Sequence, residues 1–392
     1  MKRFEFFPRT KLIFGAGCLN ELATLVLPGK KALIVTTNGG SVKRNGTLDR
    51  VIEALRKQNI ENVVFDKVTP NPLAEVDMEG AKVAKDNACD FVIGLGGGSA
   101  IDSAKLIAFM ATNPGDLTSY LTETMVQSEP SLPIISITTT SGTGSELDPF
   151  AVASMPDRRE KVGFFSETNF PKIAIVDPEL MVSCPPRFTA LQGFDTLCHL
   201  SENYISTQAN PITEMLSLKG IELVGKYLPR AVADGSDLEA RTQLALACSY
   251  AGYVLFSAGT GSQHPMEHSL SAYHEDIPHG AGLAMMYESY FTFFSDKADN
   301  AGRYAEMARA MGVDVDSLPE SERAMAYVNA VVDMMKKIGI YGLKMSDYGI
   351  TRDELVKFAE DARRTGVGSF EENDRYRLSM EETVGIYEKA FK

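Results

Sequence analysis

The sequence has few cysteines and no long apolar run. Its five cysteines are an odd number and form no CxxC pair, which favours reduced thiols in a cytoplasm over a disulfide framework. No stretch approaches the roughly 20 apolar residues of a membrane-spanning helix. Charged residues interrupt the apolar residues near the start, so we expect a cytoplasmic protein without a signal peptide.

Positive charge is also sparse. Lysine and arginine number 39 against 52 aspartates and glutamates, which gives a formal net charge of -13. This balance argues against nonspecific binding to the phosphate backbone of nucleic acids, while a local basic pocket for a phosphorylated cofactor stays compatible with it. The hydrophobic content of 44% is ordinary for a globular protein, and 392 residues fit two domains better than one.

The first half of the chain alternates short β-rich runs with amphipathic helical patterns. Such alternation predicts βαβ units and a parallel sheet. The expected strands are 32–37, 63–68, 91–96, 133–140 and 173–178, and the clearest helices between them are 47–58 and 74–87.

The second half lacks these strand patterns. Long helical patterns follow instead, at 212–232, 240–259 and 323–339. Two prolines after Cys184 interrupt any continuing element. We therefore predict an α/β domain over 1–184 and an all-helical domain over 185–392.

Two loops follow expected strands in the first domain. The run GLGGGSAID (94–102) opens a helical pattern, and its glycines would let backbone N–H groups approach a phosphate. It departs from GxGxxG at Ser99, so a plain tight turn with Ser99 as helix N-cap stays open. The run TTTSGTGSE (138–146) could hydrogen-bond a ligand or cap a helix. Two such loops at one end of a sheet favour ligand binding.

All five histidines lie between His199 and His279. Asp195/His199 and His264/His268 each have the spacing that places two side chains on one helix face. A carboxylate with several imidazoles indicates a site for one metal ion. Since one ion needs three or four ligands, some of the histidines must do something else. The alternative is a group of buried or helix-capping histidines.

The whole chain resembles the iron-containing (group III) alcohol dehydrogenases, in particular the branch with butanol-dehydrogenase-like and propanediol-oxidoreductase-like enzymes. The segments that carry the resemblance are FGAG (14–17), GGGSAIDSAK (96–105), TTTSGTGSE, DPEL (177–180), GFDTLCHLSENY (193–204) and HPMEHSLSAYHEDIPHGAGLA (264–284). It implies a dehydroquinate-synthase-like architecture, with an N-terminal dinucleotide-binding domain and a C-terminal helical domain.

The resemblance also implies roles for single residues. The metal ligands would be Asp195, His199, His264 and His279, and His268 would be a non-ligand histidine beside the nicotinamide that transfers a proton. The coenzyme contacts would be Gly97, Gly98 and Ser99 at the pyrophosphate, Thr138, Thr139 and Thr143, Lys161 near the ribose, and Leu180 packed on the coenzyme.

The turn after the first expected strand bears on the choice of coenzyme. An NAD-specific pocket usually has an acidic residue at a strand end to hold the ribose diol. Here Asn38, Gly39, Gly40 and Ser41 precede two basic residues, and no Asp or Glu occurs from 32 to 45. Because family members with a similar turn lean toward NADP, we expect NADP(H). The alternatives are NAD and a solvent-exposed loop with no role in binding.

The expected function is a metal-dependent alcohol dehydrogenase or aldehyde reductase. A divalent ion, Fe²⁺ by the resemblance with Zn²⁺ as the alternative, would act as a Lewis acid on the oxygen of a small primary alcohol, diol or aldehyde. Hydride would pass between the substrate and the nicotinamide. Beyond this substrate we expect a homo-oligomer, a dimer first of all, and neither a nucleic acid nor a membrane as partner.

Two other classes stay open. One is a zinc enzyme on the same scaffold, like glycerol dehydrogenase or dehydroquinate synthase. The segments 193–204 and 246–282 contain no Lys or Arg for an acidic substrate, which counts against the synthase. The other is a non-catalytic metal- or nucleotide-binding protein.

Overall fold

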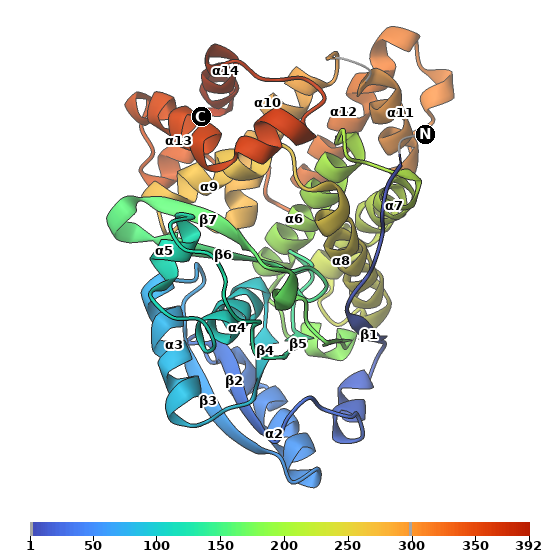
Figure 1. Cartoon of the computed structure of the whole chain (residues 1–392). Helices are drawn as coiled ribbons and strands as arrows, with labels where there is room; N and C mark the ends of the chain where they lie inside the picture. The colour runs from blue at the N-terminus through green and yellow to red at the C-terminus, as the bar shows by residue number, and fades with distance from the viewer. Residues whose placement is uncertain (1–2, 298–299) are drawn as a thin grey trace. The chain divides into compact units, whose positions relative to one another are not determined.

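The computed structural model describes residues 3–297 and 300–392. The chain divides into two compact units, and Figure 1 labels their helices and strands. One unit is Phe7–Cys184. The other is Pro185–Lys392 together with residues 3–6.

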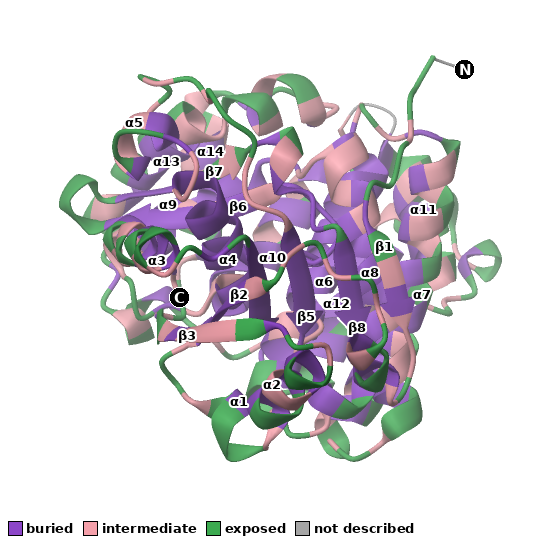
Figure 2. Ribbon diagram, turned by 60° about the horizontal axis from the view of Figure 1, so that its bottom comes forward, coloured by how far each residue is buried: buried purple, intermediate pink, exposed green. Residues whose placement is uncertain are grey.

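The first unit is built on a six-stranded parallel sheet with the order β1-β8-β5-β4-β2-β3. Its strands are β1 Lys11–Phe14, β2 Lys31–Thr37, β3 Glu61–Val68, β4 Phe91–Gly96, β5 Ile134–Thr138 and β8 Ile173–Val176. The predicted parallel sheet is confirmed. Strands β4, β5 and β8 are buried along their whole length, which explains their continuous apolar runs (Figure 2).

Helices cover both faces of this sheet. They are α1 Ser41–Arg44, α2 Thr47–Lys57, α3 Ala74–Asp86, α4 Gly98–Met110 and α5 Leu117–Leu121. Successive strand residues point to opposite faces. Ile34 therefore packs in one apolar cluster with α2, whereas its neighbours Leu33 and Val35 pack in another with α3 and α4.

A β-hairpin outside the sheet covers the remaining side of α4. Its strands are β6 Phe150–Met155 and β7 Glu160–Phe165, which pair antiparallel. Leu106, Phe109 and Met110 of α4 pack with Ala151 and Ala153 of β6. Since it lies between sheet and hairpin, α4 is apolar nearly all round and its residues from Ala100 onward are buried.

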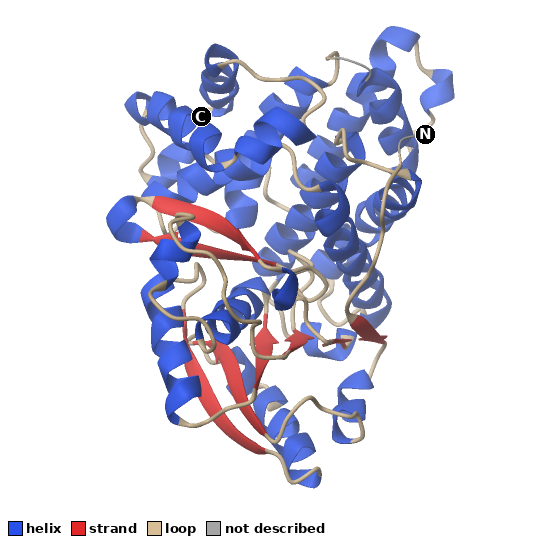
Figure 3. Ribbon diagram, viewed as in Figure 1, coloured by secondary structure: helices blue, strands red, loops and turns tan. Residues whose placement is uncertain are grey.

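The second unit is helical. Its main helices are α6 Pro186–Ile205, α7 Pro211–Ala233, α8 Leu238–Ala258, α9 Gln263–Tyr273, α10 His279–Phe294, α11 Asn300–Ala310, α12 Arg323–Lys337, α13 Leu355–Thr365 and α14 Met380–Ala390. The described part of this unit contains no strand, and Figure 3 shows the strands confined to the first unit. The predicted all-helical character of this part is confirmed.

Local sequence signals set the helix ends. Helix α7 begins with Pro211 after Asn210, whose side chain accepts from the backbone N–H of Thr213 while the Thr213 hydroxyl accepts from that of Asn210. Among the described helices, none is by itself long and apolar enough to cross a membrane. Helices α8 and α9 meet the length and composition criterion only as a pair, bent by 104°.

Candidate metal and coenzyme sites

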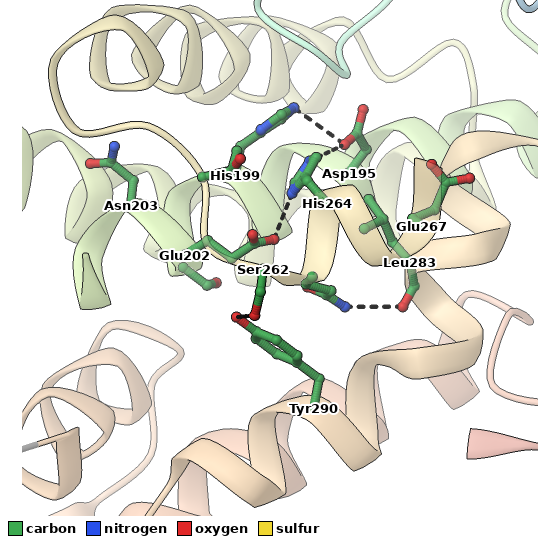
Figure 4. Close-up of polar contacts among 12 residues, drawn as sticks. Asp195, His199, Glu202, Asn203, Ser262, His264, Glu267, Leu283 and Tyr290 are labelled. Atoms are coloured by element: carbon green, nitrogen blue, oxygen red, sulfur yellow. Dashed lines mark hydrogen bonds and ion pairs between the residues drawn. The ribbon is translucent and has the colours of Figure 1, made fainter. Parts of the chain in front are cut away.

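Three helices of the second unit bring four predicted ligands together. Helix α6 carries Asp195 and His199 one turn apart, α9 carries His264 in its first turn, and His279 is the first residue of α10. Figure 4 shows Asp195, His199 and His264 turned toward one another. The i, i+4 spacing therefore does place Asp195 and His199 on one helix face.

The imidazoles converge on one carboxylate oxygen. The Nε2 atoms of His199, His264 and His279 lie 3.4, 3.5 and 3.6 Å from Oδ1 of Asp195. Within residues 3–297 and 300–392, neither Asp195 Oδ1 nor His264 Nε2 has a hydrogen-bond partner, although both are buried. Ligands bound tetrahedrally at about 2.1 Å from an ion lie roughly 3.4 Å apart. The donor set thus fits one divalent ion.

Two buried glutamates hold the outer nitrogens of two of these rings. Glu202 Oε1 lies 2.7 Å from Nδ1 of His264, and Glu267 pairs with Nδ1 of His279. Each carboxylate leaves the opposite nitrogen, Nε2, facing Asp195. Neither glutamate was predicted from the sequence. Glu202 could have been found, because it lies seven residues after Asp195 and thus on the same face of α6.

The electrostatics of the cluster are those of a cation site. Burial alone would raise the pKa of Asp195, but the charges of His199, His279 and His264 hold it below its ordinary value. Burial lowers the pKa of His199 to about 3. Burial would also lower the pKa of His264, yet Glu202 and Asp195 raise it to about 10. A proton on His264 thus balances the buried carboxylates, and a metal ion can replace it.

The other two histidines are not among the four donors around Asp195. The ring of His268 has its centroid 5.4 Å from that of His279, and one ligand atom each of His268, His279 and Glu267 lie within 4.8 Å of one another. The His279 side chain is 22% exposed, against 5% for Asp195, so the donor set is most open where His268 lies. His274 ends α9, and its Nε2 lies 3.0 Å from Glu354, which is a structural contact.

In the first unit, the predicted coenzyme contacts follow neighbouring strands. The turn 38–41 follows β2, the turn 97–99 follows β4, and the loop 139–146 follows β5. Parallel strands bring these segments to the same edge of the sheet. The chain runs from β2 to β3 on one side and from β4 to β5 on the other, so the direction of the connections reverses between β2 and β4. Ligands bind at such a switch point in open α/β sheets.

The glycine turn and the threonine loop touch each other. The backbone N–H of Thr139 donates to the carbonyl of Gly96 at 2.9 Å. A Cβ atom at Gly97 would lie 2.9 Å from Thr140 Oγ1, and one at Gly98 would lie 2.8 Å from the Thr143 side chain. A side chain at either position would therefore force the neighbouring threonine to shift, and glycine avoids this. Thr138, the last residue of β5, turns its hydroxyl back to the Thr140 carbonyl at 3.0 Å.

The alternative capping roles are wrong for both loops. Gly97, not Ser99, is the N-cap of α4, and the Ser99 hydroxyl donates to the carbonyl of Pro70 instead. The loop 138–146 leads into strand β6 rather than a helix, so Thr143 and Ser145 cap none.

The other predicted contacts lie in different surroundings. Asn38 donates its backbone N–H to Val68, and Gly40 has φ 66°, which glycine adopts without strain. Beside Ser41, Lys43 pairs with Asp66 of β3, an acid that sequence reasoning missed because it comes from the adjacent strand. Leu180 is buried with the core residues behind the sheet. Lys161 is buried on β7 opposite Ser154.

Comparison with known proteins identifies the family. The iron-containing alcohol dehydrogenase model matches residues 8–178, and the C-terminal model of the Fe-containing alcohol dehydrogenase family matches 189–391. The 1,3-propanediol dehydrogenase of Klebsiella pneumoniae is 34% identical over 100% of this chain and 99% of its own. The NAD-dependent methanol dehydrogenase of Bacillus methanolicus is 32% identical over 91% and 93%.

A solved structure agrees with these matches. The NADH-dependent butanol dehydrogenase A of Thermotoga maritima superposes with a TM-score of 0.90 at 29% identity, over 100% of this chain and 99% of its own. The chain belongs to the iron-containing alcohol dehydrogenase family. It is an oxidoreductase of alcohols or aldehydes, and neither the zinc-enzyme alternative nor the non-catalytic one is favoured.

Proposed function

We propose that Asp195, His199, His264 and His279 bind one Fe²⁺ ion per chain. The observation that carries this assignment is the convergence of three Nε2 atoms on Asp195 Oδ1 at 3.4 to 3.6 Å. When bound, the ion supplies a Lewis acid for the substrate oxygen. Glu202 and Glu267 hold the rings of His264 and His279 in the orientation that ligation needs.

Metal analysis of two histidine variants tests the assignment. His264→Ala should lose the metal and turnover, while the nucleotide still binds through the first unit. His274→Ala is the matched control, because that ring contacts Glu354 and not the donor set. Full metal content in His264→Ala would show that the ligands are different.

The identity of the ion needs its own experiment. Three imidazoles and one carboxylate do not choose between Fe²⁺ and Zn²⁺, and raw affinity favours zinc. With Fe²⁺ as the native ion, activity should fall in air and return after anaerobic reconstitution with iron. Stable activity with bound zinc throughout would reject iron and leave the ligand assignment intact.

We propose that His268 moves the substrate proton. Oxidation of an alcohol removes one hydride from carbon, which the nicotinamide takes up, and one proton from the hydroxyl group, which a nearby base must accept. His268 lies beside His279, on the more open side of the donor set. His268→Ala should keep the metal, lower kcat and change the pH profile. Loss of metal in this variant would make His268 a ligand instead.

We propose that the predicted domain 1–184 binds the coenzyme and that the predicted domain 185–392 binds the metal. The two compact units divide at the same place, after Cys184, except that residues 3–6 group with the second unit. The turn 97–99 would hold the pyrophosphate at the N-terminus of α4, and Thr138, Thr139, Thr143, Lys161 and Leu180 would line the remainder. Support comes from the tight contact between the two loops and from their place at a switch point of the sheet.

NADP(H) is the coenzyme we propose, with NAD as the alternative. The turn 38–41 has no acid of its own, Ser41 can donate to a phosphate, and Lys43 and Arg44 bring positive charge. Asp66 offsets part of the charge of Lys43. The kcat/KM ratio for NADPH over NADH should exceed one in the wild type.

Gly39→Asp should shift this ratio toward NADH, since an added carboxylate repels the 2′-phosphate. A side chain fits there, because a Cβ at Gly39 has its nearest neighbour 4.0 Å away. A wild-type ratio below one, or no shift in the variant, would reject NADP(H).

Small primary alcohols, diols or aldehydes are the proposed substrates. This proposal is supported by the relatives, which include a propanediol, a methanol and a butanol dehydrogenase. Rates for a series of such compounds with both coenzymes test this class. Formation of a homodimer stays a prediction, which light scattering from the purified protein checks.

A further inference from the structure

A second buried ionic cluster lies in the first unit and has no part in the chemistry above. Helix α4 carries Asp102 and Lys105 one turn apart, so both side chains leave the same face. Lys105 is fully buried and Asp102 is 9% exposed. A buried ammonium group is rare unless it is paired and hydrogen-bonded.

All three N–H bonds of Lys105 have acceptors. Its Nζ donates to Ser145 Oγ at 2.7 Å, to Asp148 Oδ1 at 3.1 Å and to the Phe150 carbonyl at 2.6 Å. These acceptors lie 40 to 45 residues away along the chain. One side chain of α4 therefore holds the end of the threonine loop and the start of β6.

Asp102 completes the cluster. It accepts from the Ser145 hydroxyl at 2.5 Å and from the backbone N–H of Val152 at 3.0 Å. The Ser145 hydroxyl thus donates to the carboxylate and accepts from the ammonium group. Lys161, across the hairpin from Ser154, lies close enough for its charge to act on Asp102.

The cluster sets the spacing of the proposed coenzyme contacts. Helix α4 begins at the glycine turn, and the Thr143 side chain lies 2.8 Å from the place that a Cβ of Gly98 would take. Two residues after Thr143, Ser145 is fixed to α4 by two charged partners. Release of Ser145 would free the threonine loop to move away from the turn, and a nucleotide would then have to order the loop on binding, which lowers its affinity.

We propose that Lys105 is a positioning residue for the coenzyme: with Asp102 and Ser145 it fixes the threonine loop and the β6–β7 hairpin against the glycine turn. This inference rests on the proposed coenzyme site. It gives Lys105 no contact with the nucleotide.

Lys105→Met tests the role, because methionine keeps much of the apolar stem and removes the charge. The readout is the Kd for NADPH and NADH from nucleotide fluorescence, at a temperature where circular dichroism shows the variant folded. We expect both nucleotides to bind about tenfold more weakly, because ordering the loop takes up part of the binding free energy. The iron content should stay unchanged, because the proposed ligands lie in the other unit.

Val92→Ala is the matched control for lost stability. Val92 is buried near the amino end of β4, in an apolar cluster that contains none of the proposed coenzyme contacts or Lys105 partners, so its truncation should lower the melting temperature and leave the nucleotide Kd unchanged. Equal weakening of nucleotide binding in Val92→Ala and Lys105→Met would overturn the positioning role. A Kd within twofold of wild type in folded Lys105→Met would overturn it as well.

Ser145→Ala serves if Lys105→Met does not fold. It removes one hydroxyl from the centre of the cluster and should weaken nucleotide binding in the same direction by a smaller factor, whereas Ser145→Thr should restore it. Wild-type affinity in Ser145→Ala would reject the proposal. Failure of the wild type to bind either nucleotide would instead reject the proposed coenzyme site.

Discussion

The two units each bury an ionic cluster, and the clusters differ in how their polar atoms are satisfied. Around Lys105 each partner lies within hydrogen-bond distance, and one ammonium group is held between two carboxylates. Around Asp195 the nitrogen atoms stop 3.4 to 3.6 Å short of the oxygen. A buried charge is tolerated only when it is paired. The groups around Lys105 pair with one another, whereas the spacing of the donors around Asp195 leaves room for a cation.

The largest effect on stability should come from removing the ammonium group of Lys105 from the cluster in the first unit. Lys105→Met leaves Asp102 and Asp148 buried without their cation, which should lower the free energy of unfolding of the first unit by about 3–5 kcal/mol. Urea unfolding of the wild type and of Lys105→Met measures this difference in free energy. A loss no larger than about 1 kcal/mol, as for an exposed ion pair, would contradict the buried network.

Asp77 is a buried carboxylate that lies close to Asp102 and has no cation as partner among the described residues, so its pKa is raised. Burial raises the pKa of Asp77 to about 7, whereas an unfolded chain releases this proton near pH 4. Between these values the folded state keeps a proton that the unfolded state has lost, so stability falls as pH rises from about 4 to 7, by about 1.4 kcal/mol per pH unit.

Asp77→Asn should flatten that dependence. The free energy of unfolding of wild type and variant, measured at several pH values, gives the slope of stability against pH for each protein. Between about pH 4 and 7 the decline in the variant should be smaller by about 1.4 kcal/mol per pH unit. Equal slopes would show that Asp77 is ionised in the folded protein.

Metal removal should lower the stability of the second unit, which contains the cluster around Asp195. Fe²⁺ at a hundredfold excess over its Kd should stabilise the second unit by about 2.7 kcal/mol relative to chelator-treated protein. Thermal melts with and without chelator measure the shift. His264→Ala, treated in the same way, should show none, and a shift of equal size in that variant would point to a metal bound elsewhere.

The smallest effect concerns the carboxylate behind His264. Glu202→Gln should weaken iron binding by about 10- to 100-fold, because the amide holds the ring less firmly and adds no negative charge. A metal titration measures the change. The control is Glu354→Gln, which alters the carboxylate on His274 and should leave iron affinity as it is. Equal affinities in wild type and Glu202→Gln would remove Glu202 from the site.

Periodicity and spacing along the chain predicted much of this protein. The alternation of β-rich runs with helical patterns predicted the sheet strands β2, β3, β4, β5 and β8. The runs are clearest in β4, β5 and β8, since strands buried on both faces must be apolar throughout. The i, i+4 pair placed Asp195 and His199 on one face of α6, and the loops after strands indicated where a nucleotide could bind.

The elements that the sequence did not reveal depend on contacts between distant residues. Strand β1 is four residues long with one buried, so its pattern is too weak to recognise without β8 beside it. The β6–β7 hairpin is specified by α4, whose apolar surface it covers. Asp66 reaches the turn after β2 only because β3 pairs with that strand.

The sequence by itself determined which residues share a helix face and which loops end a strand, because those relations depend on spacing of a few residues. Only the tertiary structure decided what each buried charge faces. Glu202 meets His264 across 62 residues, and Lys105 meets Asp148 across 43. The chain shows no local sign of these pairs, since it is the packing of separate elements that excludes water and brings the partners of each charge together.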